Sequence, residues 1–354
     1  MSAPRGRAFL PALEVTRGVA ALLVLVYHTG IKLLDARYFA FGPLPATDVA
    51  NLGTRGVDIF FVLSGFIIFR AHRADLGRPE RLKVYGLRRV LRIYPVYWAV
   101  LAPLLLAFFL HSQWGNDYAR MPWNAIKSVL LLPDAQPPAV NDAWTLRHEL
   151  LFYLLFAGLI WRRGVGLGLL AAWLVGIVAH ALTGTGGWVA DFLFAPFNIE
   201  FFFGMVAAWL SERMLPTRPF LLAGLAGFVA LVATEPTATL EIWPRVLGYG
   251  LASALLIVGL SGIRDAGMLP RPALYLGRIS YPLYIVQPLA IPAAALAAVL
   301  LGGKHWPPLA VMAVMMVLCL AAAAALHHLV EKPSQNASRR LTSGPKAPPA
   351  AVPL

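Results

Sequence analysis

The stretch LEVTRGVAALLVLVYHTGIKLL, residues 13–34, is long and apolar enough to cross a membrane as one helix, yet it contains Glu14, Arg17 and His28. Ionisable side chains in hydrocarbon are costly unless they face a bundle interior, a partner or water. Arg17 and His28 lie eleven residues apart. At about 100° and about 1.5 Å per residue, they share one helix face and are separated by roughly 16 Å along it. The stretch therefore predicts a membrane helix whose polar face lines a site inside a bundle.

The composition of the whole chain agrees with this prediction. Of 354 residues, 59% are hydrophobic and only 13% are charged, and the mean hydropathy is +0.68. Soluble proteins average about 25% charged residues, so the composition indicates a polytopic membrane protein. The formal charge of +13 does not predict a nucleic-acid partner, because the basic residues alternate with apolar spans instead of forming one patch. The single cysteine, Cys319, excludes an internal disulfide framework.

Further apolar runs follow the opening stretch, and we expect about ten transmembrane helices in an all-α protein. The expected spans are 13–34, 55–72, 92–112, 144–161, 164–183, 193–211, 219–234, 243–262, 273–301 and 307–330. They form one integral-membrane domain over residues 1–333. We read residues 1–10 as a retained basic lead rather than a cleaved signal. Residues 334–354, rich in Pro, Ala and Ser, are predicted to be a disordered cytoplasmic tail.

The Lys and Arg residues set the expected orientation. With the N-terminus in the cytoplasm, twenty of them fall in inner segments and eight in outer segments. The excess recurs loop by loop, as the positive-inside rule requires. We therefore expect a multi-pass membrane protein, surrounded by the lipid bilayer, with both termini in the cytoplasm.

Four polar side chains are expected at one depth near the outer surface. His28 lies on a span that runs outward, and Glu149 lies on one that runs inward, each on the order of 9 Å below that surface. Asp58 and Glu200 fall in the same outer third. The sequence predicts a shared cavity in which His28, Glu149 and Asp58 are catalytic and Glu200 binds an acceptor. Glu149 would orient His28 or bind the acceptor, whereas Asp58 has the structural alternative of neutralisation by Arg55.

A second polar set is expected at the inner surface. It comprises Arg17, Arg70, Arg73, Arg88, Arg89, Arg92 and Arg278, with Ser280, Tyr281 and Tyr284 nearby. Guanidinium groups offer paired donors to phosphate, so this set suits a phosphorylated cytoplasmic donor. We expect Arg17, Arg89, Arg92, Ser280 and Tyr281 to bind the donor, although topology-setting charge is the simpler reading of the arginines.

Two aromatic residues are candidates for the acceptor side. Trp144 and Tyr153 would stack on a ring of the acceptor, but an aromatic belt at the membrane surface has the same composition.

Five motifs then carry a family resemblance. They are RGVAALLVLVYH (17–28), GVDIFFVLSGFII (56–68), RRVLRIYPVYW (88–98), WTLRHELLFYLLF (144–156) and LGRISYPLYIV (276–286). In this order and spacing they resemble the membrane acyltransferase-3 family. The tryptophan motif and NIEFFFGM (198–205) look most like bacterial exopolysaccharide O-acetyltransferases.

The resemblance implies a ten-helix inner-membrane enzyme. It would move an acetyl group from cytoplasmic acetyl-CoA, or another acyl-CoA, to a hydroxyl of a cell-surface glycan or a lipid-linked saccharide. The essential arginine and histidine of the family correspond to Arg17 and His28, its paired arginines to Arg89 and Arg92, and the glutamate of the tryptophan motif to Glu149.

The chain departs from the family at two places. Arg147 and His148 precede Glu149 where relatives often have other pairs. The ninth span has Val286-Gln287 where many members have a pair ending in His, and glutamine cannot act as a titrating base.

Two questions remain open at the level of the residues. His28 would either remove the acceptor proton or carry the acyl group itself. A transporter or flippase of a lipid-linked saccharide would also need buried charges, but such proteins often show two corresponding halves, and the sequence has no such symmetry. We expect no bound cofactor, with acetyl-CoA acting as a substrate. No metal site is expected either, because no His, Asp or Glu cluster has ligand spacing.

Overall fold

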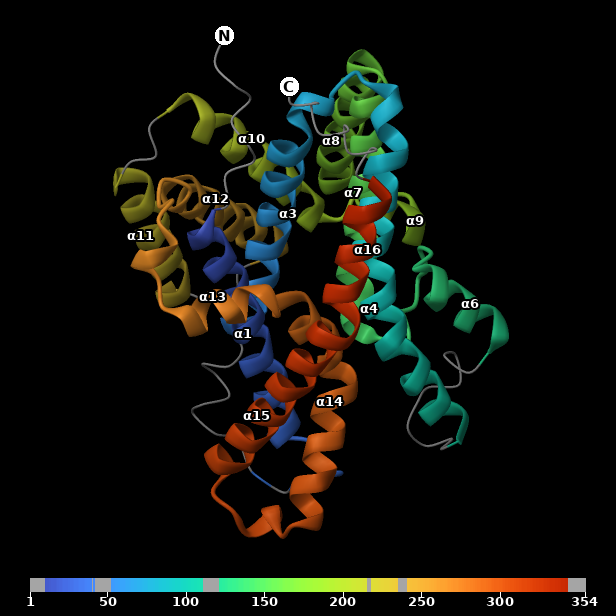
Figure 1. Ribbon diagram of the computed structural model, residues 1–354, viewed down its shortest axis with the longest axis vertical. Coiled ribbons are helices and arrows are strands. Elements are labelled where there is room, and N and C mark those ends of the chain that lie inside the picture. The colour runs from blue at the N-terminus through green and yellow to red at the C-terminus, as the bar shows by residue number, and fades with distance from the viewer. Residues whose placement is uncertain are drawn as a thin grey trace, which may run out of the picture.

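The computed structural model describes residues 10–39, 41, 52–110, 121–214, 218–234 and 241–342 (Figure 1). Helices and turns account for the regular structure of these segments, which contain no strand. Nine helices in them are long and apolar enough to cross a membrane, and a tenth apolar helix is slightly shorter. The prediction of an all-α polytopic membrane protein is confirmed.

The ten apolar helices follow the expected spans. They are α1 (Pro11–Leu33), α3 (Gly56–His72), α4 (Leu82–Leu110), α7 (Trp144–Trp161), α8 (Arg163–Thr183), α10 (Ile199–Arg213), α11 (Arg218–Thr234), α12 (Ile242–Leu260), α14 (Ser280–Leu300) and α15 (Pro308–Leu326). Shorter α-helices are α6 (Pro122–Leu130), α9 (Gly187–Leu193), α13 (Arg271–Arg278) and α16 (Lys332–Thr342). The 3₁₀ turns are η1 (Leu52–Arg55), η2 (Arg73–Asp75), η3 (Pro79–Arg81), η4 (Asn141–Ala143), η5 (Pro196–Asn198), η6 (Ala266–Met268) and η7 (Gly303–His305), and η8 (His327–Glu331) is a π-helical turn.

Two spans differ from their predicted bounds. The run 273–301 is divided at Ile279 into two helices. In Figure 1, α13 lies roughly perpendicular to the long axis of the molecule, whereas α14 runs along it. Helix α4 begins ten residues before the predicted span and has 29 residues, a length of about 44 Å. Because the hydrocarbon layer is only about 30 Å thick, the basic first turns of α4 project beyond it.

The prediction of a disordered tail from residue 334 is wrong for residues 334–342, which form most of α16. This polar helix continues from α15 through η8 and packs along the first turns of α4. The Ser334 hydroxyl donates to the carbonyl of Leu91 at 2.6 Å, and the Arg88 guanidinium donates to Thr342 Oγ1 at 3.1 Å. Tertiary contacts therefore order a segment whose composition alone would not. Residues 343–354 and the basic lead before residue 10 lie outside the described residues.

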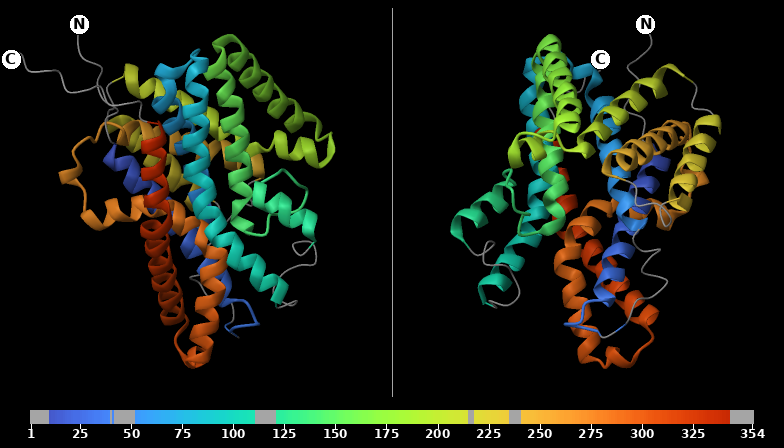
Figure 2. Two further views of the ribbon diagram at one scale, coloured as in Figure 1. Left: turned by 45° about the vertical axis from the view of Figure 1, so that its right-hand side comes forward. Right: turned by 180° about the vertical axis from the view of Figure 1, so that it is seen from behind.

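Helix α1 lies inside the bundle, where it packs against α3, α13, α14 and α15 (Figure 2). Glycines allow the close crossings. A Cβ at Gly18 would lie 2.7 Å from the backbone nitrogen of Gly277 on α13. At the crossing of α3 and α10, a Cβ at Gly204 would lie 2.0 Å from the carbonyl oxygen of Val62. This packing holds the polar face of α1 away from lipid.

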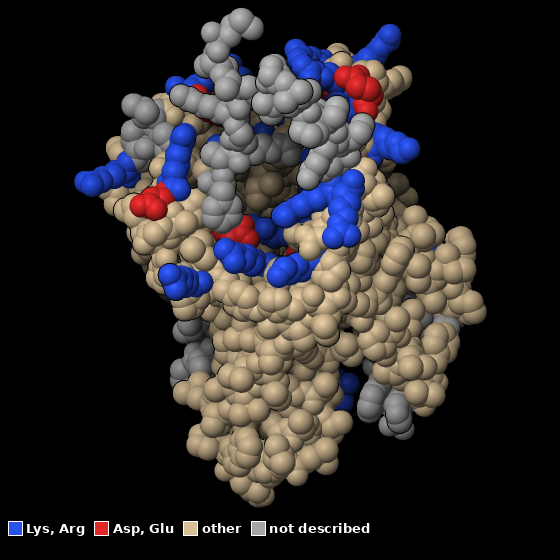
Figure 3. All heavy atoms as spheres, viewed as in Figure 1, with Lys and Arg blue, Asp and Glu red and all other residues tan. Residues whose placement is uncertain are grey.

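Lys and Arg side chains gather at one end of the molecule, which we call the basic end. Figure 3 shows them around a hollow on the visible face, while the opposite end presents other residue types there. The first turns of α4 and the whole of α16 lie toward this end. By the positive-inside rule, we predict that the basic end faces the cytoplasm.

Candidate active site

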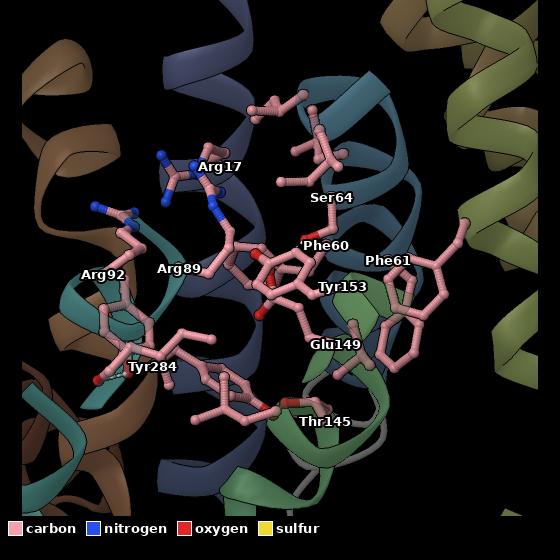
Figure 4. A pocket seen from close by; sticks show the side chains of 18 residues that line it. Arg17, Phe60, Phe61, Ser64, Arg89, Arg92, Thr145, Glu149, Tyr153 and Tyr284 are labelled. Carbon is pink, nitrogen blue, oxygen red and sulfur yellow. Dashed lines mark hydrogen bonds between the residues drawn. The ribbon is translucent and has the colours of Figure 1, made fainter. Parts of the chain in front are cut away.

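A cavity of about 270 Å³, the inner cavity, lies between α1, α3, α4, α7 and α14. Its polar lining comprises Arg17, Ser64, Arg89, Arg92, Thr145, Glu149, Tyr153, Tyr281 and Tyr284. Figure 4 shows the three guanidinium groups on the side opposite Thr145, with Glu149 and Tyr153 between them. Apolar side chains, mainly of α3, complete the wall. Three arginines of the predicted set therefore converge on one space, whereas Arg70, Arg73, Arg88 and Arg278 do not line it.

Glu149 is the carboxylate of the inner cavity. Its Oε1 accepts hydrogen bonds from Ser64 at 2.8 Å and from the Tyr153 hydroxyl. The Arg89 guanidinium lies over the Tyr153 ring, 5.4 Å from its centre. Arg17 is 4.0 Å from Glu14, too far for a hydrogen bond. The cavity thus combines fixed positive charge with one well-anchored carboxylate.

A second space of about 540 Å³, the outer cavity, lies farther from the basic end. Its polar and aromatic lining comprises Tyr27, His28, Thr54, Arg55, Asp58, Asn141, Asp142, Trp144, Phe197, Arg245 and Tyr284. These residues come from α1, η1, α3, η4, η5, α7, α12 and α14. Of the sequence-predicted residues, His28, Asp58 and Trp144 meet here.

His28 has two polar neighbours. Its Nδ1 is 2.6 Å from Gln287 Oε1 and 3.6 Å from Asp142 Oδ2. The His28 side chain is 27% exposed, whereas that of Asp142 is only 6% exposed. The backbone carbonyl of Asp142 accepts hydrogen bonds from Tyr284 at 2.9 Å and from Thr145 at 3.1 Å. The turn that carries Asp142 is therefore held firmly against the imidazole.

These contacts correct the prediction that Glu149 orients His28. Glu149 lines the inner cavity, and Asp142 and Gln287 occupy the positions next to His28. The depth estimate was too coarse to separate two cavities that are stacked along the same helices. Tyr153, expected beside an acceptor, also lines the inner cavity and hydrogen-bonds Glu149.

Asp142, Gln287 and Arg245 were missed as site residues. Asp142 was given no role from the sequence, although an acid two residues before Trp144 is a signal for a polar helix end. Gln287 was excluded as a base, and the structure gives it a different role as the partner of the imidazole. Arg245 follows Asp142 by 103 residues and precedes Gln287 by 42, and nothing local links it to either.

Asp58 and Glu200 form a buried pair behind the outer cavity. Asp58 is 1% exposed and lines the cavity, whereas Glu200 is fully buried and does not line it. Their carboxyl groups interact with each other and with Arg55 and Arg245. The predicted acceptor contact of Glu200 is therefore not made from this position. Arg55 also lies over the Tyr249 ring, at 5.0 Å.

The two remaining donor-side candidates differ in position. Tyr281 lines the inner cavity, with the Arg92 guanidinium 5.5 Å from its ring centre, and its hydroxyl donates to the carbonyl of Ile93 at 2.7 Å. Ser280 is fully buried at the start of α14 and lines neither the inner nor the outer cavity.

The inner and outer cavities are neighbours. Val57 and Tyr284 line both of them. Helix α1 passes along both as well, with Arg17 in the inner cavity and His28 in the outer one, as the eleven-residue spacing predicted. A polar route thus follows α1 from the basic end toward the opposite side.

The fold and these cavities define a polytopic membrane protein with a charged site inside its helical bundle. Comparison with known proteins gives the family: the acyltransferase domain model matches residues 10–328, so the chain belongs to the acyltransferase-3 family and is a membrane O-acyltransferase. Membership in a family of transferases leaves the transporter alternative without support.

Two characterised relatives illustrate the likeness. The exopolysaccharide production protein ExoZ of Rhizobium meliloti is 28% identical over 316 residues, which cover 83% of this chain and 94% of ExoZ. The peptidoglycan O-acetyltransferase OatA of Listeria monocytogenes is 24% identical over 193 residues, 47% of this chain and 28% of OatA. No solved structure matches the chain significantly.

Proposed function

We propose that the protein transfers an acetyl group from cytoplasmic acetyl-CoA to a hydroxyl of a cell-surface glycan or lipid-linked saccharide, within the bacterial inner membrane. The observation that carries the proposal is the pair of adjoining cavities, with three guanidinium groups in one and the His28–Asp142 pair in the other. The names of ExoZ and OatA, which refer to polysaccharide and peptidoglycan, support a saccharide acceptor.

The donor enters from the basic end. Its phosphates meet Arg17, Arg89 and Arg92, since guanidinium groups donate paired hydrogen bonds to phosphate oxygens. The apolar wall of α3 accommodates the less polar part of the donor, and the thioester reaches the boundary that Val57 and Tyr284 form between the cavities. This binding mode separates the charged end of the donor from the reacting carbonyl.

His28 acts as the general base in the outer cavity. The contact with Gln287 Oε1 favours the tautomer in which Nδ1–H of His28 donates to that oxygen. In this tautomer, Nε2 carries the free lone pair. Nε2 takes the proton of the acceptor hydroxyl while the oxygen of that hydroxyl attacks the thioester carbonyl. The thiolate then leaves, and the imidazolium returns a proton to it. Asp142, 3.6 Å from the ring, stabilises the positive charge that His28 carries between these steps.

The acceptor occupies the outer cavity from the other side. Trp144 offers a ring face for a sugar, and Asp58, Asn141 and Arg245 offer hydrogen-bond partners for its hydroxyls. A cavity of this size holds a single sugar unit of a longer saccharide.

The proposal is tested with purified His28→Ala, labelled acetyl-CoA and a saccharide acceptor. We expect transfer to fall by roughly 10³-fold, within the range for loss of a general base, while acetyl-CoA still binds. His305→Ala is the matched control, because His305 lies in η7 between α14 and α15 and lines neither the inner nor the outer cavity. Transfer by His28→Ala at the wild-type rate would contradict the proposed base.

A further inference from the structure

A third cavity, of about 340 Å³, lies at the basic end between α4 and α16, and we call it the mouth cavity. Its lining consists of Arg88, Arg89, Leu91, Arg92, Gln335, Ser338 and Arg339. Four of these seven residues are arginines, and none of the described residues that line the cavity carries a carboxylate. Like charges gathered around one space repel one another, and a bound anion relieves that repulsion.

Helix α16 is fixed in place by contacts that also position the arginines. Glu331, 1% exposed, accepts from Arg92 at 2.5 Å, from Gln335 at 3.0 Å and from His327, whose Nδ1 lies 2.6 Å away. Thr342 Oγ1 holds Arg88 at 3.1 Å. The α4 arginines and Arg339 of α16 are thus presented to the cavity by a rigid pair of helices.

The mouth cavity adjoins the inner cavity. Arg89 and Arg92 line both spaces, and the buried Nε of Arg89 has no hydrogen-bond partner among the residues that the structure describes. A molecule that extends through both would place one end among the arginines and the other beside Glu149. Helix α16 is polar, so this part of the protein lies outside the hydrocarbon. The family match ends at residue 328, so the side of the cavity formed by α16 is a feature of this chain beyond the shared domain.

We propose that the mouth cavity binds the phosphate monoester at the nucleotide end of the donor, with Arg339 and Arg88 as its ligands. This assignment rests on the proposed function, because it takes acetyl-CoA as the donor. The ribose 3′-phosphate of that molecule lies at the end opposite the thioester. The arginine-lined wall matches a doubly charged phosphate, which accepts several charge-assisted hydrogen bonds.

The probe is adenosine 3′,5′-bisphosphate, with adenosine 5′-monophosphate as the comparison lacking the 3′-phosphate. Binding to the full-length protein is measured by calorimetry in phosphatidylcholine nanodiscs. We expect Arg339→Gln to weaken bisphosphate binding about tenfold, or about 1.4 kcal/mol, and to leave monophosphate binding unchanged. Arg340→Gln is the matched control, because Arg340 is exposed on the same helix next to Arg339 but does not line the cavity.

Three results would overturn the assignment. One is equal weakening by Arg339→Gln and Arg340→Gln, which indicates surface charge alone. Another is equal weakening of both nucleotides by Arg339→Gln. The third is loss of bisphosphate binding when phosphatidylglycerol enters the nanodiscs, with Arg339→Gln insensitive to it, because a lipid headgroup is then the occupant.

Two results distinguish an error in the mouth-site assignment from an error in the proposed function. Acetyl transfer from acetyl-CoA by the wild type, together with identical nucleotide binding by Arg339→Gln and Arg340→Gln, overturns the mouth site alone. Arg339-dependent bisphosphate binding without any acetyl transfer supports a nucleotide phosphate site and contradicts the proposed function.

Discussion

The inner and outer cavities share α1 and a boundary at Val57 and Tyr284, yet their chemistry differs. In the inner cavity, fixed cations surround a carboxylate that is anchored by two hydroxyl donors. In the outer cavity, a titratable imidazole stands beside an almost buried carboxylate. The first arrangement suits the binding of an anion, and the second suits the movement of a proton. In the proposed function, one helix therefore separates donor binding from catalysis by about 16 Å.

Among the neighbours of the proposed base His28, the largest effect is expected from Asp142→Asn in the outer cavity. Removing the carboxylate leaves the imidazolium of the reaction without its counter-charge, so kcat should fall by about 100-fold while the KM for acetyl-CoA stays unchanged. Steady-state kinetics on purified protein measures both values.

Asp191→Asn is the control for this substitution. Asp191 also faces a histidine, with its Oδ1 3.1 Å from His180 Nε2, but its side chain is 65% exposed and lines neither the inner nor the outer cavity. A fall in kcat as large as that of Asp142→Asn would show that the loss of any such pair damages the enzyme generally.

An effect of intermediate size, on donor binding rather than on kcat, is expected from Arg17→Gln in the inner cavity. The loss of one charge-assisted hydrogen bond costs about 2 kcal/mol and should weaken acetyl-CoA binding about 30-fold, with a smaller change in kcat. Equilibrium binding of acetyl-CoA, measured beside kcat, separates the two. If Arg17→Gln reduced kcat and left donor binding intact, the division of labour between the cavities would be wrong.

The smallest effect is expected from Ser64→Ala. Ser64 supplies one of the two hydroxyl donors to Glu149, and the Tyr153 hydroxyl remains. Removing the hydrogen bond from Ser64 to Glu149 costs about 1 kcal/mol, so we expect a rise of about fivefold in the KM for acetyl-CoA. An unchanged KM would mean that Glu149 needs no second anchor, and a change in kcat alone would move Ser64 to the catalytic step.

The comparison also shows what the sequence could predict. Hydropathy located most of the apolar helices within a few residues, because transmembrane spans are set by length and composition, but it missed the early start of α4 and the division between α13 and α14. The spacing of Arg17 and His28 correctly placed both on the lining of cavities, since it depends only on helix geometry.

The partners of those two residues depended on tertiary structure. Glu149 and His28 were assigned equal depth, but residues on different helices at similar depth need not share a cavity. Asp142 and Gln287 meet His28 only because η4 and α14 pack beside α1. Likewise, α16 is ordered by contacts with α4 that lie over 200 residues away in sequence.

The central claim is that an acetyl group passes from a donor on the basic side to an acceptor on the opposite side, with His28 between them. Proteoliposomes of uniform orientation test it directly, with labelled acetyl-CoA supplied only at the basic end and a saccharide acceptor only at the other. We predict labelled saccharide with the wild type and with His305→Ala, and roughly 10³-fold less with His28→Ala. Transfer that requires donor and acceptor on the same side, or that continues at the wild-type rate in His28→Ala, would contradict the account.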